Sequence, residues 1–63
     1  MKFNYDSEVD VLYIQLKDED ITESEEVRPG VVLDIGKDGN LVGIEILDAS
    51  VKFGHKPDLV VEL

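Results

Sequence analysis

Alternation of apolar and polar residues is the dominant pattern in this chain of 63 residues. Between positions 11 and 17, Leu12, Ile14 and Leu16 fall on one side of an extended chain, and the intervening residues fall on the other. The same period of two runs through 2–5, 31–35 and 41–47. An amphipathic helix would instead place apolar residues three or four positions apart. The pattern therefore predicts strands in these four segments.

Residues 21–28 alternate more weakly and carry many charges. Thr22, Ser24 and Glu26 would face away from Ile21 and Glu23 if this segment is extended. A strand this polar is typical of the edge of a sheet, where charge discourages pairing with another chain. We therefore predict a fifth strand at 21–28, lying at an edge.

Glycines mark the predicted turns. Gly39 follows an aspartate between two alternating segments, which favours a hairpin because glycine accepts a positive φ. Pro29 and Gly30 mark another turn. Gly43 stands inside the strand 41–47, where it indicates a bulge or a close approach by another group.

The alternation ends after residue 47. Residues 48–53 are predicted to form a turn or short helix, with Asp48 or Ser50 as the N-cap and Gly54 as the stop. Residues 59–63 alternate again, which predicts either a sixth strand or an arm that pairs with a second subunit.

These elements predict a mainly β fold, α+β at most: an antiparallel meander of five to six short strands with one short helical turn. Residues 1–50 form the β-meander domain, and 51–63 form a C-terminal loop with the extra strand or dimer arm. One helical turn is too little to cover the apolar face of such a sheet. We therefore expect sheet to pack on sheet, in a curled monomer or across a homodimer. The homodimer is favoured because it enlarges a small core.

Charge and composition narrow the class of partner. The chain has 15 acidic and 6 basic residues, a net charge of -9, which opposes direct binding to nucleic acid. It has no cysteine and one histidine, which excludes the usual zinc sites rich in these residues. Its apolar runs are too short for a membrane span or a secretory leader. We expect a cytoplasmic protein with no cofactor.

Acidic residues supply two candidate binding sites. Asp6, Glu8 and Asp10 resemble the start of a calcium loop, but the glycine and the later glutamate that such a loop needs are missing. A polar turn capped by aspartates explains them more simply. Glu23, Glu25 and Glu26 form an acidic stretch. This stretch could attract a basic protein, or it could only keep an edge strand soluble.

Four further carboxylates could serve in acid–base chemistry. Asp34, Asp38, Glu45 and Asp48 are the candidates, with His55 as the only histidine. Such catalysis needs a group with a perturbed pKa inside a cleft, and a shallow meander offers little cleft volume. Glu45 is expected to point outward, opposite the apolar residues of its strand. We therefore predict no catalytic residue and no enzyme activity.

Three segments of the chain resemble a known family, the small prokaryotic domain of unknown function 2283. They are residues 5–14, YDSEVDVLYI; residues 26–34, EVRPGVVLD; and residues 37–50, KDGNLVGIEILDAS. Arg28 stands where the family pattern has an acidic residue, and residues 51–63 lie outside the resemblance. The resemblance implies a small sheet-rich domain with no assigned activity. Some relatives are thought to sit beside small toxin-like proteins, which implies an antitoxin-like role.

Together these observations predict a small acidic protein-interaction module. It would form a homodimer and bind a basic, toxin-like protein through a surface that includes Glu23, Glu25 and Glu26. The alternative is a domain that binds a divalent cation through the turn at Asp6, Glu8 and Asp10.

Overall fold

The computed structural model describes residues 1–57, which form five strands, a short helix and one turn of 3-10 helix. The elements are β1 (Lys2–Asp6), β2 (Val11–Gln15), β3 (Ile21–Arg28), β4 (Val31–Gly36), η1 (Lys37–Gly39), β5 (Leu41–Leu47) and α1 (Ala49–Phe53). No helix within residues 1–57 is long and apolar enough to cross a membrane. The sixth strand or arm predicted at 59–63 lies outside the described residues.

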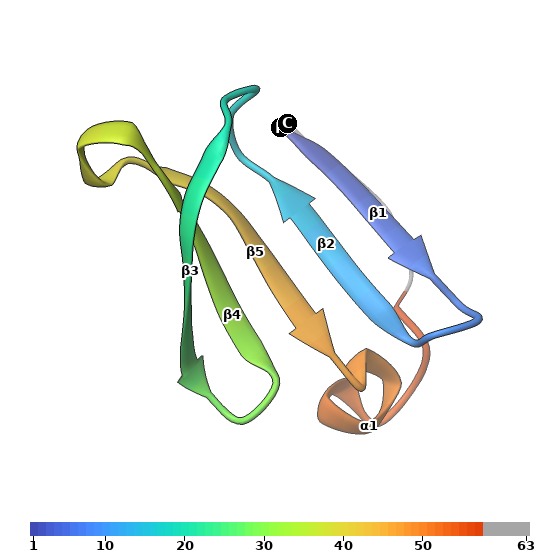
Figure 1. Cartoon of the computed structure of the whole chain (residues 1–63). Helices are drawn as coiled ribbons and strands as arrows, with labels where there is room; N and C mark the ends of the chain where they lie inside the picture. The colour runs from blue at the N-terminus through green and yellow to red at the C-terminus, as the bar shows by residue number, and fades with distance from the viewer. Residues whose placement is uncertain (58–63) are drawn as a thin grey trace.

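All five strands join in one open antiparallel sheet, in the order β1-β2-β5-β4-β3 (Figure 1). The predicted mainly β class and the antiparallel pairing are confirmed. The neighbour order is not that of a simple meander, because β5 and not β3 pairs with β2. The apolar strands β4 and β5 occupy the interior of the sheet, while every residue of β3 is exposed. The edge position predicted for 21–28 is therefore correct.

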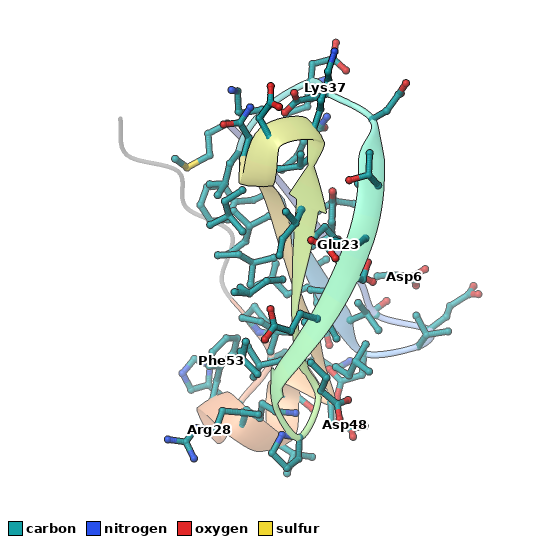
Figure 2. All side chains as sticks on the ribbon, turned by 60° about the vertical axis from the view of Figure 1, so that its left-hand side comes forward. Asp6, Glu23, Arg28, Lys37, Asp48 and Phe53 are labelled. Atoms are coloured by element: carbon teal, nitrogen blue, oxygen red, sulfur yellow. The ribbon has the colours of Figure 1, made fainter. Side chains whose placement is uncertain are left out.

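The pairing register places the apolar residues of neighbouring strands on one face, which we call the apolar face. One row runs Tyr5–Leu12–Ile46–Val31 and the next runs Phe3–Ile14–Ile44–Leu33. Residues that pair directly in a sheet point to the same side. Figure 2 shows the result, with side chains made almost only of carbon gathered on one side of the sheet.

The fully buried core is small. Among apolar side chains of residues 1–57, only Leu12, Val42 and Ala49 are buried, at 6%, 1% and 0% exposure. Most other residues of the apolar face are half-buried. Helix α1 spans five residues and lies on the apolar side at one end of the sheet, where Figure 2 labels Phe53. Among residues 1–57, the helix therefore covers only one end of the apolar face.

The turns follow the glycines, with local differences from the prediction. Gly39 has a φ of 78° at the β4–β5 hairpin, and Asp38 before it also has a positive φ, 62°. Gly54 ends α1 with a φ of 80°. Asp48 is the N-cap, but within the described chain its side chain makes no capping hydrogen bond. Ser50, the other predicted cap, lies inside the helix.

Strand β2 ends two residues earlier than predicted. The amides of Leu16 and Lys17 both donate to the carbonyl oxygen of Val42, at 2.7 and 3.1 Å. Two consecutive amides on one acceptor interrupt the regular ladder, as in a bulge. On the other side of β5, the register shifts between Asp34 and Ile35. The bulge predicted near Gly43 is therefore present.

Candidate functional site

The polar face is the side of the sheet opposite the apolar face, and it carries a cluster of four side chains near its centre. The register aligns Tyr13, Glu45 and Val32 in one row, and Gly43, Asp34 and Ser24 in the next. We call Tyr13, Ser24, Asp34 and Glu45 the carboxyl cluster. They come from four different strands, β2, β3, β4 and β5. Only the register of the whole sheet brings them together.

Asp34 is the unusual member of the carboxyl cluster. It is 1% exposed, although aspartate is almost never fully buried without a partner. Its Oδ1 atom accepts a hydrogen bond from the Ser24 hydroxyl at 2.6 Å. Its Oδ2 atom is also buried, and no donor within the described chain bonds to it. A buried carboxylate oxygen without a donor is costly, so this atom requires an explanation.

Gly43 creates the space that Tyr13 occupies beside Asp34. A Cβ atom added to Gly43 would lie 2.5 Å from the Tyr13 hydroxyl oxygen and 2.9 Å from its Cζ atom. The close approach predicted at Gly43 is therefore present, and the group that approaches is the Tyr13 phenol. Gly43 pairs with Asp34, so the phenol lies next to the residue that faces Asp34. We expect an aromatic ring in this position to help shield the carboxylate of Asp34 from water.

Asp34 contributes to a raised pKa at both Glu45 and Tyr13. The pKa of Glu45 is raised above its ordinary value of 4.5, by a hydrogen bond with Asp34, then by burial, then by repulsion from the Asp34 charge. The pKa of Tyr13 is raised by burial, and then by repulsion from Asp34 and Glu45. A hydrogen bond between two carboxyl groups needs a proton on one of them.

Asp10 organises a second polar cluster, where the β1–β2 turn meets α1. Its Oδ1 atom accepts hydrogen bonds from the Tyr5 hydroxyl at 2.6 Å and the Ser50 amide at 3.0 Å. Its Oδ2 atom accepts from the Ser50 hydroxyl at 2.7 Å, and its carbonyl oxygen accepts from the Ala49 amide at 3.0 Å. The bonds from Tyr5 and Ser50 to its carboxylate lower the pKa of Asp10, the bond from Tyr5 most strongly. Asp10 therefore attaches the helix to the sheet.

The other members of the proposed cation turn have separate roles. Asp6 accepts a hydrogen bond from the amide of Glu8 at 3.0 Å, which is the aspartate turn expected from the sequence. Asp6 and Glu8 are exposed. Within residues 1–57, no group of three or more acidic, histidine or cysteine side chains could hold a metal ion.

The acidic stretch of β3 divides between the two faces. Glu25 pairs with Leu33 and Glu23 with Ile35, so both glutamates border the apolar face. Glu26 pairs with Val32 and lies on the polar face. All three are exposed. The apolar face therefore has an acidic border along β3.

The remaining candidates for acid–base chemistry do not join Asp34 and Glu45. Asp38 lies in η1, before β5 begins, and Asp48 lies beyond its other end, next to α1. His55 is exposed after the helix, and its Nδ1 atom is 2.8 Å from the carbonyl oxygen of Lys56. Of the five residues considered, the structure brings only Asp34 and Glu45 together.

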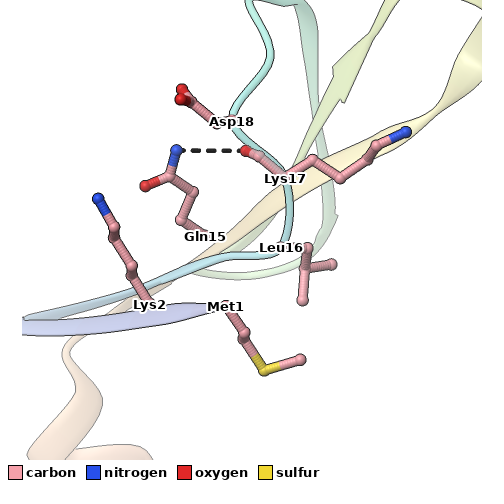
Figure 3. Close-up of a pocket in the computed structure, with 6 residues that line it drawn as sticks. All are labelled: Met1, Lys2, Gln15, Leu16, Lys17 and Asp18. Atoms are coloured by element: carbon pink, nitrogen blue, oxygen red, sulfur yellow. Dashed lines mark hydrogen bonds between the residues drawn. The ribbon is translucent and has the colours of Figure 1, made fainter.

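A small cavity lies at the start of β1 and the end of β2 (Figure 3). It measures about 130 Å³ and is lined by Met1, Lys2, Gln15, Leu16, Lys17 and Asp18. The Gln15 side chain donates to the carbonyl oxygen of Lys17 at 3.2 Å across this region. Ligand sites usually measure roughly 300–1,000 Å³. This cavity is therefore too small to serve as a binding site for an organic ligand.

The sequence identified Asp34 and Glu45 as candidates but did not associate Tyr13 or Ser24 with them. The one local signal was Gly43, because an interior glycine in a strand indicates close approach by another group. Which group approaches depends on the pairing of β2 with β5, which alternation alone does not specify.

The fold and the carboxyl cluster define a small, mainly β domain built on a single open antiparallel sheet. A family model described as a protein of unknown function (DUF2283) matches residues 2–50. The chain belongs to this family, as the resemblance of its three segments predicted. No curated protein and no solved structure was found to match the chain.

Proposed function

We propose that this domain is a protein-interaction module that binds a basic amphipathic partner across its apolar face and the acidic border of that face. The observation that carries the proposal is the position of Glu23 and Glu25 beside half-buried apolar residues such as Leu33. An apolar surface bordered by charge of one sign suits a partner with an apolar centre and a basic flank.

The shape of the sheet supports this role. The molecule measures 35 × 28 × 18 Å, so it is thin and presents a broad face. A stable interface needs roughly 800 Å² from each partner, which a face with these two longer dimensions can supply. Its core has few fully buried side chains, so covering the apolar face would also stabilise the fold.

Charge favours a basic partner over a second copy. Each chain carries a net charge of -9, so two copies repel each other, whereas a cationic protein is attracted. The homodimer predicted from the sequence is the competing occupant of the same face. An antitoxin-like role follows if the basic partner is a small toxin-like protein.

Charge reversal on the two faces of β3 tests this proposal. The tagged domain is expressed at native level, and the captured protein is identified by mass spectrometry and then purified for calorimetry. We expect a basic protein whose binding weakens in E23K/E25K and persists in E26K, which reverses a charge on the opposite face of the same strand. Equal effects of E26K and E23K/E25K, or a captured protein without basic character, would contradict the proposal.

Light scattering of the purified domain across a dilution series tests the homodimer. A dimer that persists at low micromolar concentration, and that I44D converts to a monomer, would assign the apolar face to a second copy. A folded monomer leaves that face to the basic partner.

Cation binding through Asp6, Glu8 and Asp10 remains the alternative function. It is less favoured because the Asp10 carboxylate already accepts three hydrogen bonds, from the Tyr5 hydroxyl and from the amide and hydroxyl of Ser50, which a metal ion would have to replace. Calorimetry with Ca²⁺, Mg²⁺ and Mn²⁺ tests this alternative, and D10N serves as the variant that should abolish any measured heat.

A further inference from the structure

We propose that Asp34 and Glu45 hold a single proton between them and so form a proton-binding site in the polar face of the sheet. This inference is independent of the proposed partner. It rests on three features of the structure: the burial of Asp34, the missing donor at one of its oxygens, and the position of Glu45 on the adjacent strand.

The first two features show that the site is one donor short. Asp34 is 1% exposed, and Ser24 satisfies Oδ1 at 2.6 Å. Oδ2 is buried and has no donor within the part of the chain that the structure describes. A buried carboxyl oxygen without a hydrogen-bond donor is costly, so the site favours any group that supplies a donor.

The third feature identifies the donor. Asp34 pairs with Gly43 and Glu45 with Val32, so the two carboxyl groups are diagonal neighbours on adjacent strands. Glu45 is half-buried, and the neighbouring Asp34 carboxyl group is the main cause that raises the pKa of Glu45. Two carboxylates in such a position cannot both ionise freely, because their charges repel in a poorly hydrated site. One shared proton removes the repulsion and provides the missing hydrogen bond.

Other charged groups on this face do not replace the proton. Tyr13 of β2 is beside the pair, and its own pKa is raised, so it stays neutral. Glu26 of β3 pairs with Val32, so it is a diagonal neighbour of Asp34 on the other side of β4, but it is exposed to solvent, whereas Glu45 is half-buried. Asp6 and Lys2 belong to the edge strand β1, and Lys2 lies three strands, about 14 Å, from Asp34. At that distance salt screens most of its charge.

The shared proton links the stability of the domain to pH. A raised pKa in the folded state means that the folded chain keeps this proton after the unfolded chain has lost it. The stability due to the proton is complete below about pH 4.5, the ordinary value for glutamate, and is lost as pH rises through the folded pKa of Glu45. Above that pH, the polar face carries one more negative charge.

The test is a carbon NMR titration of the Glu45 side-chain carboxyl group, with urea unfolding across the same pH range. We expect Glu45 to titrate above 4.5 in the native chain and to return toward 4.5 in D34N, where the Asp34 charge is absent. In E45Q the side-chain amide donates to Asp34 at every pH. The loss of stability as pH rises through the folded pKa of Glu45 should therefore be absent from this variant.

E26Q is the matched control, since it removes one carboxylate from the same face and changes the net charge equally. It should keep the pH dependence that E45Q loses. A Glu45 midpoint at 4.5 in the native chain would overturn the proposal. An identical decline in E45Q and E26Q would overturn it as well. The NMR titration uses the native chain, so the test stands even if a variant fails to fold.

Discussion

Replacing Gly43 by alanine tests whether Tyr13 occupies the space beside Asp34. The new Cβ atom would lie 2.5 Å from the Tyr13 hydroxyl oxygen, 2.9 Å from its Cζ atom and 3.0 Å from the carbonyl oxygen of Ile14. Carbon does not approach other heavy atoms this closely, so the Tyr13 ring must move away. The movement also opens the carboxyl cluster to water.

Two opposing effects set the change in the free energy of unfolding that G43A causes. Overpacking in a filled site costs about 1–3 kcal/mol. Alanine in place of a strand glycine returns roughly 0.5–1 kcal/mol, because it has less backbone freedom to lose on folding. We therefore expect G43A to lower the free energy of unfolding by about 0–2.5 kcal/mol, with a midpoint slightly above 1 kcal/mol. A domain of this length has a total of roughly 3–9 kcal/mol, so the loss would be easy to measure.

A double-mutant cycle assigns the loss to Tyr13. Urea unfolding followed by far-ultraviolet circular dichroism gives the free energies of G43A, Y13A and G43A/Y13A, each at two protein concentrations to detect any dimer. In the Y13A background the G43A substitution should be nearly neutral, because the two closest contacts are gone. Y13F should relieve G43A only in part, since it removes the hydroxyl and leaves Cζ. An equal loss with and without Tyr13 would refute the reasoning.

Substitutions at three further positions test the turns. D10A removes an acceptor for Tyr5 and Ser50, so α1 should loosen, and hydrogen exchange at the Ala49 amide should become faster. Because the pKa of Asp10 is lowered in the folded state, Asp10 stabilises the fold above about pH 3.8, and this stabilisation is lost as pH falls through the folded pKa. Acid unfolding of D10N should lack this loss of stability. G30A should lower the free energy of unfolding in urea by about 1–2 kcal/mol, since Gly30 has a φ of 75° and an added Cβ would lie 2.5 Å from Lys52 Nζ. Adding K52A to G30A should restore only part of this loss, because the strain of the positive φ remains. D38V should lower the melting temperature, at a cost of about 1–2 kcal/mol, because a β-branched residue resists the φ of 62°, whereas D38N should be neutral.

Local signals in the sequence were sufficient for the strands and most turns. The predicted edge strand at 21–28 coincides with β3, and the strand at 41–47 coincides with β5. Alternation succeeds here because one face of each strand is apolar, and the side-chain period of a strand is two whatever its neighbours are. Gly39 and Gly54 marked their turns because each adopts a positive φ that other residues resist.

The local signals failed where a neighbour changed the backbone. Strand β2 is shorter than predicted because the amides of Leu16 and Lys17, the two residues after it, converge on the Val42 carbonyl oxygen, which belongs to a strand far along the chain. Asp38 and Asp48 adopt positive φ values that their residue type permits but does not require. Glu45 was expected to point outward, and it does lie opposite the apolar face, but its partner there was not foreseen.

The sequence by itself determined the mainly β class, the face on which each strand is apolar, the exposed acidic strand and the membership of the family. The tertiary structure alone decided that β5 lies between β2 and β4, and therefore that Tyr13, Asp34 and Glu45 meet. The physical reason is that alternation fixes the side to which a residue points, whereas strand order and register fix its neighbours. Those neighbours depend on how apolar strands from distant parts of the chain share the interior of the sheet.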